Sequence, residues 1–168
     1  GGPFDLVLSG KNILTLENVL VGEVWVCSGQ SNMEMPVGNV ATWYSGVLNY
    51  QEEIAAANYP DIRLFKEGRT VSGNPSDTCE GTWTKCSPES VADFSAVAYF
   101  FGRKLHMELG IPIGLIDASC GGTNIEAWMS RAVLDSDPDF KPALDNFRQQ
   151  MDDYPKLMKV YEQRMVQH

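Results

Sequence analysis

Short apolar runs along the first 119 residues predict β-strands. Residues 1–20 alternate weakly in FDLVLSG and NILTLENVL, which predicts two strands joined by Ser9-Gly10-Lys11. Three further runs predict buried strands over about 23–28 (EVWVCSG), 62–67 (IRLFKE) and 113–119 (IGLIDAS). Because long segments separate the last three strands, their connections can be crossovers and their sheet parallel.

The N-terminal hairpin does not belong naturally to the pattern that follows it. We therefore interpret residues 1–20 as the end of a preceding β-domain, 21–133 as the main α/β region, and 134–168 as a helical insertion or arm. The chain starts without an initiator Met, a basic segment or an apolar signal region. We expect it to be part of a longer protein.

The segment SVADFSAVAYFFGRKLHMELGIP, which starts at Ser90, has the pattern of a helix. Its apolar residues recur at helical spacing, namely Phe94, Val97, Ala98, Phe101, Leu105 and Leu109. Ser90 or Asp93 can cap its start. Gly110 occupies the place of a C′ glycine, and Pro112 follows it. The helix leads directly into the strand predicted at 113–119, as expected of an α/β unit.

In the C-terminal part, apolar residues step alternately by four and three, which makes a heptad seam. The seam consists of Phe140, Leu144, Phe147, Met151, Tyr154, Met158, Tyr161 and Met165. Pro155 lies inside it, so we expect a kink or two helices. Such a stripe is typical of an arm that packs on its own domain, and a dimerisation surface is the alternative.

Composition and charge exclude several classes of protein. The 168 residues suffice for one domain with a core, and 43% hydrophobic with 21% charged residues is ordinary for a globular chain. A net charge of −9 argues against nucleic-acid partners and against an anionic membrane surface. No apolar run approaches the roughly 18 residues of a membrane-spanning helix.

The four cysteines form no C-x-x-C pattern, so they do not indicate a metal site. Cys79 and Cys86 flank the short loop CEGTWTKC, and a disulfide between them would suit an exported protein. Two reduced thiols are the equal alternative. Cys27 and Cys120 each follow an apolar run, which indicates buried thiols.

The first candidate for chemistry is GQSNM, residues 29–33, directly after a predicted strand. A nucleophilic serine must be exposed, rigid and close to backbone N–H donors, and a small residue before it lets the chain turn sharply. The common hydrolase pattern G-x-S-x-G needs a glycine where Met33 stands, so this is a different turn. An ordinary strand-to-loop turn is the alternative interpretation of Ser31.

The second candidate is DASCGGTNIEAW, residues 117–128, which follows another predicted strand. Gly121-Gly122 permits a tight turn with exposed backbone, and Thr123 or Asn124 can cap a helix from residue 125 onward. A helix start favours an oxyanion or a phosphate, whereas close strand–helix packing would equally explain the glycines. Both candidates lie at carboxyl ends of predicted parallel strands, where ligands bind in open α/β sheets.

Three segments together resemble the sialate O-acetylesterase family: VLVGEVWVCSGQSNMEMPV, FSAVAYFFGRKLH and IPIGLIDASCGGTNIEAWMS. That family belongs to the SGNH-hydrolase superfamily and is related to acetylxylan esterases. The resemblance runs from about residue 1 to 133. It implies a flavodoxin-like, three-layer α/β/α fold with a parallel sheet. Only three of the five or so strands of that fold are predicted here, so we expect an incomplete domain.

The resemblance also implies roles for residues of the two motifs. Ser31 corresponds to the catalytic serine that attacks an acetyl carbonyl, and its own backbone N–H would be one oxyanion donor. The GGT segment replaces the superfamily's donor asparagine, which makes Gly121 and Gly122 the candidates, with Thr123 beside them. The superfamily's donor glycine corresponds to Ser95 in this chain.

Gln30 and Asn32 flank the serine, and their amides could orient the loop, contact the substrate or pin the turn. The implied reaction is acyl transfer, in which Ser31 attacks, donors hold the oxyanion and water releases acetate. It requires no metal and no cofactor. Trp43 and Tyr44 could stack on a sugar ring or anchor a helix to the core.

A serine nucleophile needs a base, which the superfamily carries as Asp-x-x-His near the end of the domain. The only histidines here are His106 and His168, and Arg103 and Met165 stand three residues before them. His106 lies off the apolar stripe of its predicted helix, so we expect it to face solvent. The base is therefore expected from the remainder of the enzyme or from a second chain.

Three functions remain open at this point. The first is a serine esterase acting on an O-acetylated carbohydrate, with 9-O-acetylated sialic acid as the favoured substrate. The second is the same chemistry on acetylxylan or another glycan. The third is a non-catalytic fragment or carbohydrate-binding module. The resemblance and the possible disulfide point to a secreted, lysosomal or periplasmic protein.

Overall fold

The computed structural model describes residues 1–40, 43–70 and 75–166. They divide into two compact units, residues 1–122 and the part from Thr123 onward. The second unit therefore begins before residue 134, where the helical arm was expected to start. The division at residues 20 and 133 into a preceding domain and an esterase region stays a prediction.

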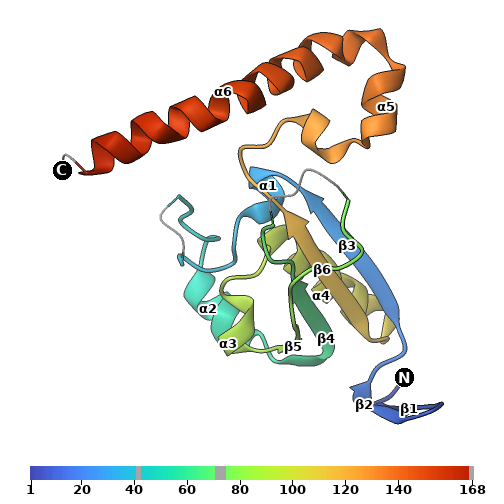
Figure 1. Ribbon diagram of the computed structural model, residues 1–168. Coiled ribbons are helices and arrows are strands. Elements are labelled where there is room, and N and C mark those ends of the chain that lie inside the picture. The colour runs from blue at the N-terminus through green and yellow to red at the C-terminus, as the bar shows by residue number, and fades with distance from the viewer. Residues whose placement is uncertain (41–42, 71–74, 167–168) are drawn as a thin grey trace. The chain divides into compact units, whose positions relative to one another are not determined.

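The centre of the first unit is a four-stranded sheet in the order β3-β6-β4-β5 (Figure 1). The first three of these strands, β3 (Glu23–Gly29), β6 (Ile113–Ser119) and β4 (Tyr59–Lys66), are parallel, which confirms the three predicted strands and their direction. The last strand, β5 (Trp83–Cys86), runs antiparallel to β4. Its four residues, WTKC, were too few for their pattern to indicate a strand.

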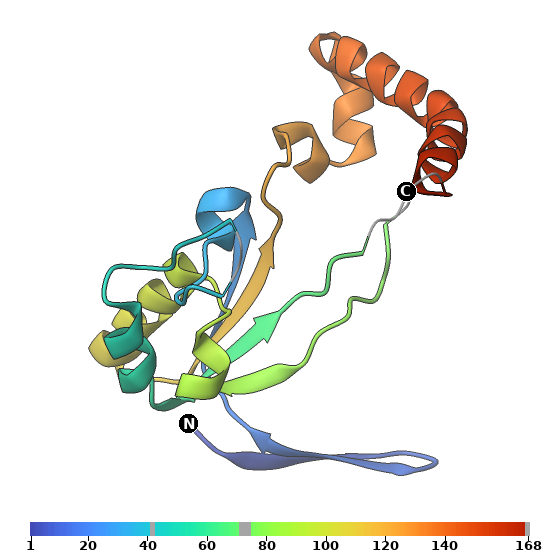
Figure 2. The same ribbon diagram turned by 90° about the vertical axis from the view of Figure 1, so that its left-hand side faces the viewer.

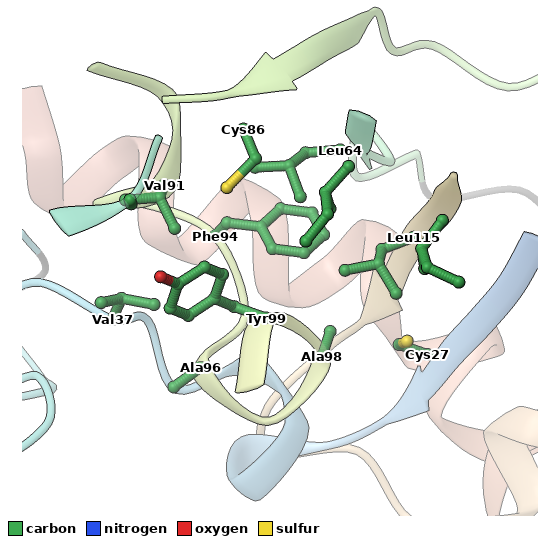
Figure 3. Packing of buried hydrophobic residues seen from close by; sticks show 13 residues of the cluster. Cys27, Val37, Leu64, Cys86, Val91, Phe94, Ala96, Ala98, Tyr99 and Leu115 are labelled. Carbon is green, nitrogen blue, oxygen red and sulfur yellow. The ribbon is translucent and has the colours of Figure 1, made fainter. Parts of the chain in front are cut away.

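One face of this sheet carries the core. Inward-facing strand residues pack against α4 (Ala96–Leu109) and the segment before it, and Figure 3 shows Phe94 and Tyr99 close to Leu64 and Leu115. Gly102 lets α4 approach the sheet, since a Cβ there would lie 2.6 Å from Cδ1 of Leu115. Helices α2 (Tyr50–Ala56) and α4 lie on the same side of the sheet (Figure 2).

The alternate residues of β3 point the other way and are exposed, since Val24 and Val26 keep 61% and 66% of their surfaces accessible. Within the described first unit, apolar burial is therefore concentrated on one face of the sheet. The expectation of an incomplete three-layer domain stays a prediction.

The N-terminal hairpin consists of β1 (Phe4–Ser9) and β2 (Ile13–Val19), which pair antiparallel as predicted. Its side chains are exposed along nearly its whole length. Its assignment to a preceding β-domain stays a prediction.

The start of the predicted long helix differs from the expectation. A short helix α3 (Pro88–Val91) comes first, with Ser87 and Ser90 forming a capping box. Helix α4 begins separately, and its cap is Ser95, whose Oγ accepts from the Ala98 N–H at 3.2 Å. The predicted caps of the long helix, Ser90 and Asp93, were wrong because the chain turns between the two helices. Gly110 ends α4 at φ 64°, as predicted.

The second unit contains η1 (Ile125–Trp128), α5 (Arg131–Ser136), η2 (Pro138–Phe140) and α6 (Lys141–Val166). The helix expected from residue 125 is only a short 3₁₀ turn. Of the two alternatives at Pro155, the break into two helices was wrong, because α6 continues through it as one helix of 26 residues, and the kink stays a prediction. Whether its seam packs within the protein or forms a dimer stays a prediction.

None of the four cysteines forms a disulfide. Cys79 is exposed whereas Cys86 is buried in the core, so the reduced alternative holds. Cys27 is buried as predicted, and Cys120 is half-buried. None of the helices in the described ranges combines the length and the hydrophobicity that a bilayer-spanning segment needs.

Candidate active site

The first candidate motif forms a sharp turn between a strand and a helix. β3 ends at Gly29, whose φ of 148° favours glycine, and α1 (Ser31–Glu34) starts two residues later. The Ser31 hydroxyl is half-buried and lies 3.3 Å from Oε1 of Gln30, to which it donates. The N–H groups of Ser31 and Asn32 open the helix, so no preceding turn supplies them with a carbonyl. The sharp turn that was predicted after this strand is thus present, and the role of Ser31 as a nucleophile stays a prediction.

The second motif lies beside the first, because β3 and β6 pair in parallel from Glu23–Ile113 to Gly29–Ser119. Figure 1 shows α1 at the end of β3 and next to the end of β6. A Cβ built on Gly121 would lie 3.4 Å from the Cα of Ser31. The structure therefore brings the two motifs together, as the parallel sheet predicted.

Within the GGT segment, the three residues have different environments. The Gly121 N–H donates to Oε2 of Glu34 at 2.9 Å, so this N–H is engaged within the protein. Gly122 is exposed, has φ 78°, and lines the adjacent pocket. Thr123 belongs to the second unit, where its Oγ1 accepts from Nε1 of Trp128 at 2.8 Å. Gly122 is therefore the open backbone position next to the Ser31 turn.

Ser95 is buried next to the Ser31 turn, with 1% of its surface accessible. Its hydroxyl donates to the Met33 carbonyl at 2.6 Å and accepts from the Ala98 N–H at 3.2 Å. The hydroxyl therefore holds α1 on the core. An oxyanion role for Ser95 stays a prediction.

The flanking amides also differ. The side-chain oxygen of Gln30 accepts from the Ser31 hydroxyl at 3.3 Å, and its backbone carbonyl accepts from the N–H groups of Met33 and Glu34, both at 2.9 Å. The role of the Gln30 side-chain amide, in orienting the loop, contacting substrate or pinning the turn, stays a prediction. Asn32 is exposed and remains available for contact with a substrate.

Glu34, which the sequence analysis did not select, lies at the centre of the site. Its side chain is 14% exposed. Oε2 accepts from the Tyr44 hydroxyl and from the Gly121 N–H, each at 2.9 Å, and Oε1 forms an ion pair with Arg69. The only sequence signal was an acidic residue one helical turn after the serine.

A pocket of about 410 Å³ opens beside these residues and is lined in part by Glu34, Tyr44, Gly122 and the exposed Trp43. A second one of about 400 Å³ adjoins it at Glu34, Lys66 and Arg69. Lys66 forms an ion pair with Asp93 at 2.7 Å, and Arg69 forms one with Glu34. The positive charges in the pocket lining are therefore neutralised by neighbouring carboxylates of the same lining. A separate cavity of about 360 Å³ lies at the opposite ends of the strands, near Asn18 and Pro112.

Asp117, near the end of β6, is the one buried acid of the sheet face that carries the core, with 3% of its surface accessible. Burial raises the pKa of its carboxyl above the ordinary value, whereas a 2.5 Å hydrogen bond from the Ser119 hydroxyl and the charge of Lys66 act in the opposite direction. Asp117 also borders the second pocket.

His106 is half-buried rather than solvent-facing, which corrects the expectation. Its Nδ1 lies 2.7 Å from the Ile111 carbonyl, and its ring packs edge-on against Tyr59. It therefore lies before the start of β6, at the opposite end of that strand from the Ser31 turn. His168 lies outside the described residues. Among the residues that are described, no three His, Cys, Asp or Glu side chains are arranged to hold a metal.

Comparison with known proteins defines the family. Residues 21–161 match the family described as carbohydrate esterase, sialic acid-specific acetylesterase. The sialate O-acetylesterases of Rattus norvegicus and Homo sapiens are 36% and 35% identical to the chain over 148 residues, or 80% of it. This chain belongs to the sialic acid-specific acetylesterase family of carbohydrate esterases.

A solved structure supports the same assignment. A carbohydrate acetylesterase from Xanthomonas citri aligns over 84% of the chain with a TM-score of 0.72 and 35% identity. This confirms the expected α/β fold class with its mainly parallel sheet. The chain spans about a quarter of the length of the related sialate O-acetylesterases (26% and 27%) and 31% of the solved structure.

Proposed function

We propose that this chain is the nucleophile-bearing part of a carbohydrate O-acetylesterase, with Ser31 as the nucleophile. One observation carries the proposal. Ser31 is the first residue of α1, at the carboxyl end of a parallel strand. The Gly121 turn packs against it, since a Cβ built on Gly121 would lie 3.4 Å from the Cα of Ser31. Ligands of open α/β sheets bind at this edge.

The proposed reaction is acyl transfer. Ser31 Oγ bonds to the acetyl carbon, its proton passes to a base, and the sugar oxygen leaves as an alcohol after it receives that proton. Water then attacks the acetyl-serine and releases acetate. Backbone N–H groups that open α1, together with Gly122, are the proposed donors to the oxyanion, because the Gly121 N–H is already held by Glu34. No metal or cofactor takes part.

We assign the base to an Asp-x-x-His pair in the remainder of the enzyme or in a second chain. His106 is not suitable, because its ring is held by the Ile111 carbonyl before β6 begins. Removal of a triad histidine leaves only a small part of the rate in serine hydrolases, so this chain alone is proposed to be inactive.

We propose an O-acetylated carbohydrate as the substrate, with 9-O-acetylated sialic acid favoured. Support comes from the names of the related proteins and from Trp43, which lines the pocket with 89% of its surface exposed. Exposed indole rings commonly present an apolar face to a ligand while the N–H stays wet. Acetylxylan or another glycan is the second candidate. A secreted, lysosomal or periplasmic location rests on the resemblance alone.

The test uses the natural full-length protein and its Ser31→Ala variant. Acetate release is measured from 9-O-acetylated sialic acid and from acetylated xylan, and a fluorophosphonate probe reports serine activation. We expect Ser31→Ala to lose activity and labelling, while Ser9→Ala in the exposed hairpin keeps both. A full-length protein that neither labels nor releases acetate would favour the carbohydrate-binding alternative. Preference for xylan would correct the substrate only.

A further inference from the structure

We propose that Glu34 is a positioning residue that holds the Gly121 turn against the Ser31 turn. The inference rests on the proposed esterase function of Ser31 and adds to it a residue that acts through the geometry of the site. Glu34 and Ser31 occupy the two ends of the single turn α1, whose Met35 N–H bonds the Ser31 carbonyl at 3.1 Å.

The contacts of Glu34 come from three segments far apart in the chain. Oε2 accepts from the hydroxyl of Tyr44 and from the backbone of Gly121, which is 87 residues away. Oε1 meets the guanidinium of Arg69. Hydrogen bonds to an ionised carboxylate are about twice as strong as neutral ones. One side chain therefore ties the nucleophile helix to the neighbouring loop and to the pocket wall.

The position of Gly121 depends on this bond. A Cβ at residue 121 would lie 2.3 Å from Oε2 of Glu34 and 3.0 Å from the Tyr44 hydroxyl. Only glycine lets the backbone N–H approach the carboxylate so closely. The consequence is that Gly121 serves to fix the turn, and Gly122, the next residue, is left facing the pocket.

Glu34 is acidic and one turn from the nucleophile, so a general base is the competing role. The geometry argues against it, because Oε2 already accepts two hydrogen bonds, Oε1 faces the guanidinium of Arg69 in an ion pair, and the side chain is only 14% exposed. A base must reach the serine proton with a free lone pair in a productive pose. The two roles predict different behaviour of the Gln variant.

The experiment compares Glu34→Gln and Glu34→Ala in the full-length protein, with 4-nitrophenyl acetate as substrate so that sugar binding does not enter. Gln keeps an oxygen that can accept from Tyr44 and Gly121, so the Gly121 turn should keep its position and we expect kcat within about threefold of wild type. Ala removes the acceptor, so the Gly121 turn should shift relative to Ser31. A shift of about 1 Å in a catalytic site lowers the rate about 100-fold, so we expect kcat to fall by that factor with KM nearly unchanged. The acid limb of the pH profile should not move in Glu34→Gln.

Glu53→Ala is the matched control, because Glu53 forms a similarly half-buried ion pair with Arg103 at 2.6 Å, away from both motifs. It should change stability without changing kcat. Thermal unfolding of each variant separates loss of the fold from loss of position. Should Glu34→Ala not fold, Tyr44→Phe removes one bond to the same oxygen, and an unchanged kcat in that variant would count against the proposal.

A double-mutant cycle gives an independent test. Gly121→Ala should lower kcat strongly when Glu34 is present and much less in the Glu34→Ala background, since the clashing carboxylate is then absent. Equal losses in both backgrounds would overturn the inference. So would a Glu34→Gln variant as inactive as Ala with a lost acid limb, which would make Glu34 a base.

The failure of this inference is distinguishable from failure of the proposed function. If Ser31→Ala abolishes activity and every Glu34 variant matches wild type, only the role of Glu34 is wrong. If Ser31→Ala retains activity, the proposed nucleophile is wrong.

Discussion

The Ser95 hydroxyl donates a 2.6 Å hydrogen bond to the carbonyl of Met33, which lies two residues after the proposed nucleophile. The same oxygen accepts from the Ala98 N–H and so caps α4. Backbone bonds from Ala96 to Met35 and from Val37 to Phe94 run alongside. The Ser31 turn is therefore joined directly to the helix that covers the core.

Replacing Ser95 with Ala removes both bonds of that hydroxyl. We expect the free energy of unfolding to fall by about 1–2 kcal/mol, the cost of losing a helix cap. Urea unfolding of the full-length protein measures the change. Ser130→Ala, which removes the exposed cap of α5, is the control and should cost less. A loss below about 0.5 kcal/mol would contradict a structural role for Ser95.

Gly102 marks the closest approach of α4 to the sheet. In Gly102→Ala the new methyl would lie 2.6–3.0 Å from three atoms of Leu115, a residue with no accessible surface. We expect a loss of about 1–3 kcal/mol from overpacking, although Ala is the better helix former by about 1 kcal/mol. Thermal unfolding tests this, with the exposed Lys104→Ala of the same helix as control. A more stable Gly102→Ala would show that α4 can move away.

The burial of Asp117 has a consequence for pH dependence. Its folded-state pKa is raised by burial, so the native state holds the proton more tightly than the unfolded chain. The resulting stability is complete below the unfolded pKa of about 3.9 and is lost as pH rises through the folded value. Asp117→Asn cannot ionise and should remove this downward slope of the unfolding free energy.

Urea unfolding at a series of pH values from 3 upward, in roughly half-unit steps, measures the difference between wild type and Asp117→Asn. Asp61→Asn, at an exposed position of β4, controls for the loss of one carboxylate. A wild-type curve parallel to that of Asp117→Asn would contradict the raised pKa.

Thiol reactivity distinguishes the cysteines. Burial raises the pKa of Cys86 to about 11, with Arg103 and a backbone bond from Tyr59 acting in the opposite direction. Burial and the nearby Asp117 raise the pKa of Cys27. Because the thiolate is the reactive form, iodoacetamide should modify the exposed Cys79 first.

Peptide mass spectrometry follows the alkylation, first in native buffer and then in guanidinium. Cys86 and Cys27 should react only after unfolding. Resistance of both Cys79 and Cys86 in denaturant until a reductant is added would instead reveal the disulfide that the structure does not contain.

Several elements were predictable because their signals are local. The three parallel strands follow from apolar runs, and Gly110 ends α4 where it was expected because a left-handed residue closes a helix over a few positions. Strand β5 and the cap at Ser95 were missed. A four-residue strand has too little pattern, and Ser90 and Asp93 looked like equivalent caps of one long helix, which the turn after Val91 in fact divides into two.

The sequence by itself determined the positions of the Ser31 turn and of the Gly121-Gly122 turn. Each turn follows a strand, and each strand is recognisable from an apolar run of a few residues. Their adjacency followed from a parallel sheet. Only the tertiary structure decided which polar groups are already hydrogen-bonded within the protein. The Gly121 N–H donates to Glu34, 87 residues away, and the Ser95 hydroxyl donates to the Met33 carbonyl. Hydrogen bonds between such distant residues depend on packing of the whole unit, which local pattern does not contain.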